Sequence, residues 1–293
     1  MSITGQDRTG PVELSVVVVN HNAGDQVVRC VRSVLDSAGE CSLRVVIVDN
    51  QSSDGSPDAV QDAFPQVSMI RNGANLGFAA AANQGMRAVE SEFVLLINPD
   101  AEVEAGTLEA LLKVARDHPR AGAIGLLTRN PDGTIYPSAR RVPSIGLGLA
   151  HTVLPSFWPG NPWSRRYRLG DWDHLSERRV DWVSGSSALF RRNALDEVGL
   201  FDEGYFMYVE DMDLCTRMRR AGWEVWFTPQ VEVMHIVGTA TAGRRRMTRE
   251  HSRSIYRYFV KYYGSGWGNL LRPLARLLLG LRAWYVSWRK HER

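Results

Sequence analysis

A chain of 293 residues, 44% of them hydrophobic, can bury a sizeable core as one α/β domain or as a domain with an appendage. Its three cysteines are widely spaced and odd in number, which argues against a disulfide framework or a Cys-x-x-Cys metal site and favours a reducing cytosol. The net charge of +3 is unevenly distributed. Residues 244–293 hold 13 Lys and Arg against two acidic residues, whereas the rest holds 22 basic and 30 acidic residues.

The N-terminal part of the chain alternates apolar strands with helices. Residues 1–11 carry no apolar run, so no secretory signal is visible and a flexible N-terminus is predicted. The strand–helix alternation that follows predicts a doubly wound, Rossmann-like, mostly parallel sheet flanked by helices. The predicted strands are 14–19, 43–48, 67–70 and 92–97, and the predicted helices are 23–37, 57–63 and 80–89.

The three long strands of this part end in polar residues: Asn20, Asp49 and the Asn-Pro-Asp triplet that closes with Asp100. Open α/β sheets bind ligands outside the carboxyl ends of their strands, so these side chains indicate a nucleotide site. Neither common glycine-rich phosphate motif is present, which also disfavours a nicotinamide oxidoreductase. Without such a motif, a divalent metal, Mg²⁺ or Mn²⁺, bound to Asp100 is the simplest way to hold the phosphates. The alternative is an ordinary turn before a helix at 105–117.

The second half of the chain is less regular. A strand at 121–128 and a short β element at 133–138 lead into a loop-rich, aromatic insertion at 140–172, which suits either a sugar or lipid acceptor or plain surface packing. The core then resumes. Its predicted elements are a strand at 180–190 broken by Gly185, a helix from about Asp211, and strands at 224–227 and 231–235.

Four sequence blocks resemble glycosyltransferase family 2, which has the GT-A fold. Their order and spacing make the resemblance specific. They are Asn20-His21-Asn22, Asp49 to Gly55, the N-x-x-N-x-G-F-A-x-x-x-N pattern of Asn72 to Asn83, and Asn98-Pro99-Asp100. The Phe201 to Leu214 segment, preceded by Trp182-Val183-Ser184-Gly185, resembles the same family. The resemblance covers residues 12–262 and implies a nucleotide-sugar half at 12–115 and an acceptor half at 116–262.

The resemblance implies roles on the donor side. Asp49 reads the nucleotide base and Asp100 is the metal-binding carboxylate. Asn98 stands where many relatives carry the first Asp of an Asp-x-Asp motif, which leaves one fewer carboxylate for the metal. The implied donor-binding residues in this half are Asn20, Asn22, Asp49, Ser52, Asp54, Asn75, Gly77, Phe78, Asn83 and Asn98.

On the acceptor side, the resemblance makes Asp211 the general base and Glu210 a residue that orients the acceptor. The alternative is that these acids only favour a helix N-terminus. A base must come within hydrogen-bond reach of its hydroxyl, and neighbouring aromatic side chains can exclude water and raise its pKa. The acceptor site would also include Trp182, Gly185 and Ser186.

Two further parts of the donor site come from the C-terminal side. His235 lies 24 residues after Asp211, a spacing at which relatives place a metal-binding histidine; the alternative is a packed or capping histidine. Arg249 and Arg253 belong to an arginine-rich segment that can close over the donor diphosphate, since guanidinium groups match phosphate oxygens. A solvated basic face is the alternative.

The implied reaction is an inverting, metal-dependent sugar transfer. Within the family, the motifs most resemble rhamnosyltransferases that move L-rhamnose from dTDP-L-rhamnose to polyprenyl-diphosphate-linked N-acetylglucosamine, in synthesis of the linker between arabinogalactan and peptidoglycan in the cell wall. Two alternatives stay open: a family-2 transferase that uses a UDP-sugar, and a non-catalytic membrane protein that binds sugar nucleotides.

Residues 263–293 are predicted to form a basic amphipathic helix that lies on an anionic membrane. Its apolar arc is Leu270, Leu274, Leu277, Leu281, Trp284 and Trp288, and its basic residues on the other side are Arg272, Arg276, Arg282, Arg289 and Lys290. The arginines argue against a transmembrane helix, so a cytoplasmic protein peripheral to the inner face of the plasma membrane is expected. Packing on the protein's own core or in a homodimer interface is the alternative. The wide leucine face disfavours nucleic acid as a partner.

Overall fold

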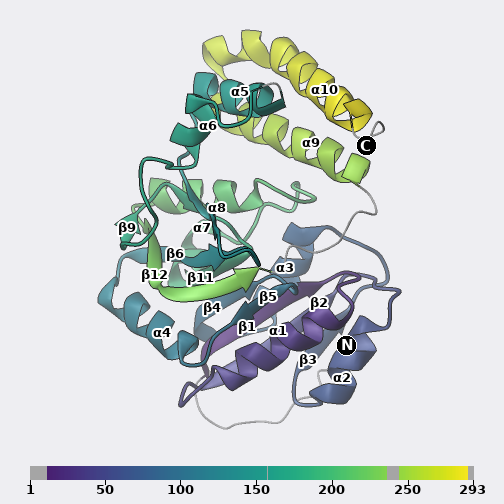
Figure 1. The fold of residues 1–293 in the computed structure, drawn as a ribbon, viewed down its shortest axis with the longest axis vertical. Coiled ribbons are helices and arrows are strands. Elements are labelled where there is room, and N and C mark those ends of the chain that lie inside the picture. Colours follow the sequence, from purple (N-terminus) through teal and green to yellow (C-terminus); the bar gives the residue numbers. More distant parts are fainter. Residues whose placement is uncertain (1–11, 157, 236–243, 290–293) are drawn as a thin grey trace.

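The computed structural model describes residues 12–156, 158–235 and 244–289, so the predicted flexible N-terminus lies outside the described residues. Within these ranges a mixed sheet of ten strands crosses the lower body of the molecule (Figure 1). One half of the sheet is parallel, in the order β3-β2-β1-β4. These strands are β1 (Val12–Asn20), β2 (Leu43–Asp49), β3 (Ser68–Arg71) and β4 (Ser91–Ile97).

The other half of the sheet mixes directions. Strand β11 joins β4 to β6 and is antiparallel to both, β12 is parallel to β6, and β5 is antiparallel to β12. Short strands β7 and β9 pair with β6 and β12, and β8 pairs with β10 in a separate two-stranded sheet. The bounds are β5 (Ala101–Val103), β6 (Ala121–Arg129), β7 (Ile135–Tyr136), β8 (Ala139–Arg140), β9 (Arg178–Arg179), β10 (Trp182–Val183), β11 (Ser187–Arg191) and β12 (Glu224–His235).

Helices cover both faces of the sheet, which explains the continuous apolar runs of its strands. Val17 packs in one buried cluster with α3, α7 and α8, whereas its neighbours Val16 and Val18 pack in a second cluster with α1, α2 and α4. The predicted α/β fold is therefore confirmed. The bounds are α1 (Asp25–Asp36), α2 (Ser56–Ala63), α3 (Phe78–Arg87), α4 (Thr107–Asp117), α7 (Arg192–Val198) and α8 (Glu210–Arg220).

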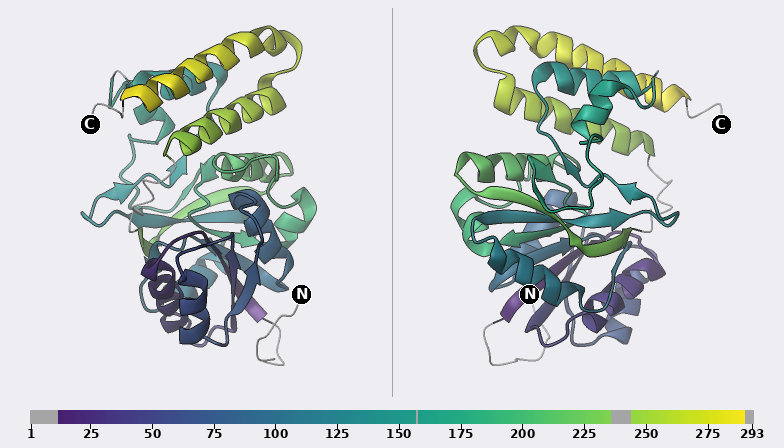
Figure 2. Two further views of the ribbon diagram at one scale, coloured as in Figure 1. Left: turned by 90° about the vertical axis from the view of Figure 1, so that its right-hand side faces the viewer. Right: turned by 60° about the vertical axis from the view of Figure 1, so that its left-hand side comes forward.

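A further layer of helices lies above α8 (Figures 1 and 2). Helix α10 packs against α9 and α5, and the hydroxyl groups of Tyr258 on α9 and Thr216 on α8 are 2.8 Å apart. Among the described residues, no helix is both long and apolar enough to span a bilayer. The layer consists of α5 (Ile145–Val153), the 3₁₀ helix η1 (Leu154–Ser156), α6 (Pro162–Tyr167), α9 (Arg244–Tyr263), the 3₁₀ helix η2 (Gly266–Leu271) and α10 (Arg272–Arg289).

The insertion at 140–172 is more ordered than the sequence analysis predicted. It contains α5 and α6, and both helices begin with a capping residue: Ser144 accepts a hydrogen bond from Leu147 N, and Asn161 accepts one from Ser164 N, at 3.4 and 2.9 Å. Asn at the N-cap followed by proline is a favourable helix start. A loop was predicted because prolines often end helices, and the capping residues Ser144 and Asn161 were not recognised. The absence of disulfides is confirmed, because all three cysteines are buried and free.

The predicted C-terminal helix is present as α10, but its apolar arc does not pack on the protein. Leu274, Leu277 and Leu281 are 48, 58 and 52% exposed. The helix contacts α9 and α5 through the opposite face, where Ala275 and Leu279 are each 4% exposed. Helix α10 thus docks on the protein, as one alternative expects, but through the face of Ala275 and Leu279 and not through the leucine arc. Membrane association stays a prediction. The homodimer stays a prediction.

Candidate active site

The carboxyl ends of β1 and β2 carry a network of polar side chains. Asn20 and Asp49 are opposite each other in the parallel register. The Asn20 amide donates to Asp49 Oδ1 at 3.0 Å and to Ser52 Oγ at 3.1 Å, and the same Ser52 hydroxyl accepts from Asn22 N at 2.9 Å. Asp54 accepts at 2.8 Å from a backbone N–H of the loop after β1. The structure therefore brings together the five donor residues predicted from these two strand ends.

A second polar group connects this network to the acceptor half. The Asn50 amide donates to Asn75 Oδ1 at 3.0 Å and to the Gly77 carbonyl at 3.2 Å. Phe78 N donates to the Phe206 carbonyl at 2.7 Å. Gly77 has φ +88°, and a Cβ there would overlap the Phe206 carbonyl oxygen, so glycine is required both for the backbone and for this close approach.

Asn83 does not present its side chain to a ligand. It is fully buried, donates to the Phe201 carbonyl and to Glu203 at 2.9 Å each, and accepts from Phe201 N at 3.0 Å. Asn83 therefore fixes Phe201 and Glu203, in the segment that leads to Glu210 and Asp211.

The two predicted metal ligands lie side by side. Strand β12 places His235 opposite Ala101, directly after Asp100. His235 Nε2 is 3.0 Å from Asp100 Oδ1, and Asn98 Nδ2 is 3.5 Å from the same ring nitrogen. The described residues contain no group of three or more His, Cys, Asp or Glu that could hold a metal. One carboxylate and one imidazole fit a divalent ion whose other ligands come from substrate phosphates and water.

The two predicted catalytic carboxylates stand at the start of α8. Asp211 Oδ2 accepts from Gly185 N at 3.0 Å and Oδ1 accepts from Met212 N at 2.8 Å. Burial raises the pKa of Asp211, although these two hydrogen bonds and the positive charge of Arg140 act in the opposite direction. Burial and the charge of Asp211 raise the pKa of Glu210 well above its usual value, and Glu210 Oε2 has no hydrogen-bond partner among the described residues.

The backbone that presents these acids is strained. Tyr208 and Val209 have φ angles of +69° and +73°, in the left-handed region that β-branched and bulky residues rarely adopt. Such strain costs of order 1–3 kcal/mol per residue and persists where the surroundings impose it. Here the two residues turn the chain so that α8 begins at Glu210, facing the cavity.

A cavity of about 300 Å³ extends from the two acids to His235, one of the predicted metal ligands. Its wall includes Glu210, Asp211, His235 and Asn98, together with the predicted residues Phe78, Trp182, Gly185 and Ser186. Several other residues of this wall were not predicted from the sequence, among them Tyr136, Arg140, Tyr208 and His251.

Arg140 is the most consequential of the missed residues. It donates to the Tyr136 hydroxyl at 2.8 Å, and its guanidinium lies 4.9 Å from the ring centre of Trp182. Arg140 belongs to β8, and its partner in the register is Trp182 on β10. The sequence shows only two consecutive arginines in an irregular stretch. No local pattern predicts that β8 pairs with β10, which is what brings the charge of Arg140 to Asp211.

The arginines predicted to close over the donor are not gathered at this cavity. Arg249 and Arg253 are exposed on α9, and Arg253 forms an ion pair with Glu250 at 2.7 Å. Residues 236–243, which precede α9, lie outside the described residues. Arg246 lies 4.8 Å from the ring centre of Phe206, beside the donor-side segment. A contact of Arg249 or Arg253 with the diphosphate stays a prediction.

Comparisons with known proteins match the chain to glycosyltransferases. The family model described as Glycosyl transferase family 2 matches residues 15–199, and Glycosyl transferase family group 2 matches residues 166–288. The N-acetylglucosaminyl-diphospho-decaprenol L-rhamnosyltransferase of Mycobacterium tuberculosis is 40% identical over 283 residues, which cover 92% of this chain and 91% of that protein. Rhamnosyltransferase WbbL of Escherichia coli K12 is 24% identical over 84% of this chain and 92% of its own length.

Solved structures share the fold at low sequence identity. The mannosyltransferase PcManGT of Pyrobaculum calidifontis, in complex with GDP-Man and Mn²⁺, has a TM-score of 0.60 and 19% identity, over 96% of this chain and 77% of that one. GalNAc-T7 with UDP, GalNAc and Mn²⁺ has a TM-score of 0.61 and 17% identity, over 96% and 57%. With the family model matching more than half of the sequence and a relative 40% identical along nearly its whole length, the chain is a glycosyltransferase that belongs to family 2.

Proposed function

We propose that this enzyme transfers L-rhamnose from dTDP-L-rhamnose to N-acetylglucosamine carried on a polyprenyl diphosphate, in cell-wall linker synthesis. The observation that carries the proposal is the 40% identity, over 92% of the chain, to an enzyme named for rhamnosyl transfer to that kind of acceptor. The donor follows from the resemblance of the motifs to dTDP-rhamnose-dependent transferases. A network of polar side chains at the ends of β1 and β2 supports a nucleotide site, and a cavity with two buried carboxylates supports an acceptor sugar.

In the proposed reaction, Asp211 is the general base. Its carboxylate takes the proton from an acceptor hydroxyl, and the hydroxyl oxygen attacks the anomeric carbon while the bond to the nucleoside diphosphate breaks, which inverts the configuration. The N–H groups of Gly185 and Met212 fix the carboxylate in one orientation. Burial, which raises its pKa, makes it a stronger base than an exposed aspartate. Glu210 borders the same cavity and orients the acceptor.

Asp100 and His235 would hold a divalent ion, with Asn98 beside them. Such an ion supplies positive charge for the departing diphosphate. On the nucleotide side, Asp49 would read the nucleobase, and its hydrogen bonds with Asn20 and Ser52 fix the position of its carboxylate.

The same proposal places the enzyme at the inner face of the plasma membrane, where a polyprenyl-linked acceptor is reached from the cytosol. The exposed leucine arc of α10 supports this placement. On an interfacial helix, apolar side chains enter the lipid layer and basic residues contact anionic headgroups.

The test is transfer from a panel of dTDP- and UDP-sugars to N-acetylglucosaminyl-diphosphoryl-polyprenol, with Mg²⁺ or Mn²⁺ and with chelator. Rhamnose transfer from the dTDP-sugar alone, lost in chelator and restored by the ion, is the expected result. Transfer from a UDP-sugar instead would contradict the donor. Binding of dTDP-rhamnose without transfer to any acceptor would favour a non-catalytic sugar-nucleotide binder.

A further inference from the structure

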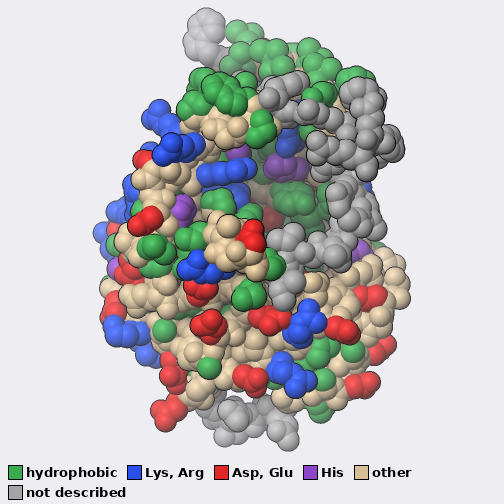
Figure 3. Space-filling view, viewed as in Figure 1, with side chains coloured by type: hydrophobic (Ala, Val, Ile, Leu, Met, Phe, Trp, Pro, Cys, Tyr) green, Lys and Arg blue, Asp and Glu red, His purple; other side chains and the backbone are tan. Residues whose placement is uncertain are grey.

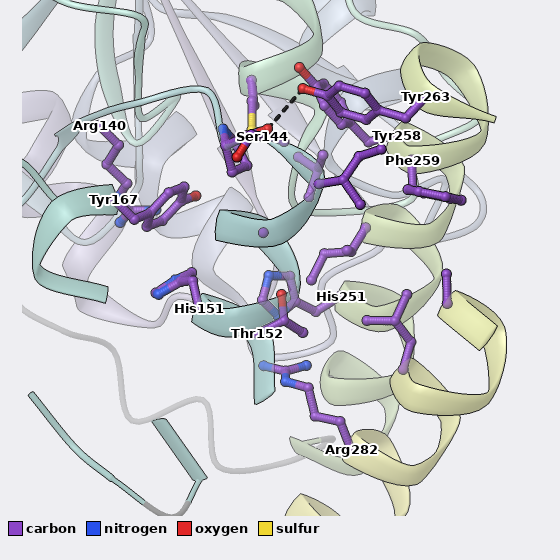
Figure 4. Close-up of a pocket in the computed structure, with 18 of the residues that line it drawn as sticks. Arg140, Ser144, His151, Thr152, Tyr167, His251, Tyr258, Phe259, Tyr263 and Arg282 are labelled. Atoms are coloured by element: carbon purple, nitrogen blue, oxygen red, sulfur yellow. Dashed lines mark hydrogen bonds between the residues drawn. The ribbon is translucent and has the colours of Figure 1, made fainter. Parts of the chain in front are cut away.

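A second, larger cavity lies between the catalytic site and the layer of helices α5, α9 and α10. Its volume is about 480 Å³, and Figure 4 shows the residues around it. The two cavities share five wall residues: Arg140, Tyr167, Val209, Met212 and His251. The second cavity is therefore continuous with the wall of the first, on the acceptor side of the two catalytic acids.

Most of this second cavity is apolar. Helix α10 contributes Ala275, Leu279 and Val286, which fall on one face together with Arg282. Helix α9 contributes Ile255 and Phe259. The lining suits a hydrocarbon chain better than a sugar, because a sugar would leave its hydroxyl groups without partners against these side chains.

The charged side chains of this cavity are basic. Arg140, Arg168 and Arg282 border it together with His151 and His251, and none of the described lining residues is acidic. Arg282 donates a 3.4 Å hydrogen bond to the Ser252 hydroxyl. Burial and the neighbouring arginines lower the pKa of His151 to about 4 and that of His251 to about 3. With these histidines neutral near pH 7, the three arginines concentrate positive charge beside an apolar cavity, which favours a negatively charged ligand.

We infer that this cavity binds the lipid diphosphate of the acceptor, with Arg282 and Arg140 on the phosphate oxygens and the first isoprenoid units between α5, α9 and α10. The inference rests on the proposed function, because only a lipid-linked acceptor joins a diphosphate to a hydrocarbon chain. It also assigns two faces to α10. One face closes the acceptor cavity, and the opposite, exposed leucine arc is where the rest of the lipid can meet a membrane.

The test is equilibrium binding of farnesyl diphosphate to the full chain, compared with farnesol and inorganic diphosphate. The wild-type protein is expected to bind farnesyl diphosphate at least roughly tenfold more tightly than either fragment. Arg282→Gln should weaken binding by about 10- to 100-fold, the range expected for the loss of a charged hydrogen bond. Arg276→Gln removes the same charge from an exposed position on the same helix and should change binding less than twofold.

A second variant tests the cavity rather than the charge. Gly148 lines the cavity on α5, and an added Cβ would meet only Pro143, at ordinary contact distance. Gly148→Phe should fill the space and weaken farnesyl diphosphate binding, while dTDP binding, which reports on folding, stays unchanged. Unchanged binding in both variants, or wild-type binding no tighter than that of inorganic diphosphate, would overturn the inference. Farnesyl diphosphate binding that depends on Arg282, in an enzyme that transfers no rhamnose, would refute the proposed function and leave this site standing.

Discussion

At the scale of single residues, Asp211 shows how one carboxylate is prepared for its role. Burial favours the protonated form, whereas two backbone N–H groups and the nearby guanidinium of Arg140 favour the ionised form. The balance raises the pKa without removing the charge-stabilising contacts. Glu210 has the burial but lacks a hydrogen bond at Oε2, so it is the more strongly protonated member of the pair.

This difference predicts that replacing the two carboxyl groups by amides has unequal effects. Asp211→Asn should lower kcat by about 10²- to 10⁴-fold, the usual contribution of general base catalysis, while the affinity for dTDP-rhamnose stays the same. Glu210→Gln should cost less, since the neutral amide resembles the protonated acid. Steady-state kinetics and nucleotide titration of both variants decide the assignment. Full turnover in Asp211→Asn with an inactive Glu210→Gln would make Glu210 the base.

Arg140 provides a pH-dependent test of the same site. Only the ionised form of Asp211 accepts a proton, so kcat/KM falls as pH drops through its pKa, and the raised pKa moves this loss to higher pH than for an exposed aspartate. Arg140→Gln removes a charge that lowers this pKa, so the acidic limb of the profile should shift to still higher pH. Arg141→Gln is the matched control and should leave the limb in place. An unshifted limb in Arg140→Gln would mean that another group is the base.

At the scale of elements, the last acid of the Glu-Asp-x-Asp block attaches helix α9 to helix α8. Asp213 is fully buried and accepts from Arg217 Nε at 2.9 Å and from the Tyr262 hydroxyl at 2.8 Å, and Lys261 Nζ is 2.7 Å from its Oδ1. Arg217 also donates to the carbonyls of the turn after α7. Asp213 is therefore one of the residues that hold the helix layer to α8, together with the contact between the Tyr258 and Thr216 hydroxyl groups.

Asp213→Ala should consequently destabilise the protein. The substitution leaves the charges of Arg217 and Lys261 without their buried partner, at a cost of about 3–5 kcal/mol in the free energy of unfolding. Asp213→Asn keeps an acceptor oxygen of the same shape and should cost less. Denaturant unfolding of the two variants measures both values. A change below about 1 kcal/mol in Asp213→Ala would show that the contacts at α8 are not what secures α9.

The elements that sequence patterns predicted best are those whose signal is local. The strands β1, β2 and β4 and their polar ends follow from apolar runs that stop at Asn20, Asp49 and the Asn-Pro-Asp triplet. Helices α5 and α6 were missed because prolines and aromatic residues obscured their capping residues. The turn at Tyr208 and Val209 could not be foreseen either, since neither residue type favours positive φ.

The parts of the site that depend on long-range pairing could not be derived from residue spacing. The contact of Asp100 with His235 requires β12 to pair with β5, and the position of Arg140 requires β8 to pair with β10. The family resemblance named Asp100 and His235 because their motifs recur, but it carried no information about Arg140. The resemblance therefore predicts residues that relatives have in common, whereas the position of Arg140 is known only from the structure.

At the scale of the whole molecule, the parts follow one another along the long axis. The parallel half of the sheet lies in the lower body, α8 lies above the sheet, and the helix layer lies above α8 (Figures 1 and 2). The space-filling view shows hydrophobic side chains gathered at the upper end, a hollow below them bordered by histidine and basic side chains, and mixed charges over the lower body (Figure 3).

This polarity predicts that the leucine arc of α10 is the membrane contact. Replacing Leu274, Leu277 and Leu281 by Ser removes three half-exposed side chains, each contributing about 1 kcal/mol to partitioning, so binding to phosphatidylglycerol vesicles should weaken by roughly 100-fold. Transfer to a short, water-soluble acceptor should be unchanged, because the arc faces away from the acceptor cavity. Vesicle sedimentation measures the first effect and steady-state kinetics the second.

A matched control tests whether any exposed leucine contributes to vesicle binding or only the leucines of this arc. Leu175 is 57% exposed in the segment before β9, and Leu175→Ser should leave vesicle binding intact. High salt should weaken the wild-type protein's binding only in part, because screening affects the basic residues of the tail and not the apolar contact. If the triple variant still sediments with vesicles as the wild type does, basic residues alone hold the enzyme at the membrane and the leucine arc must serve another partner, such as a second copy of the chain.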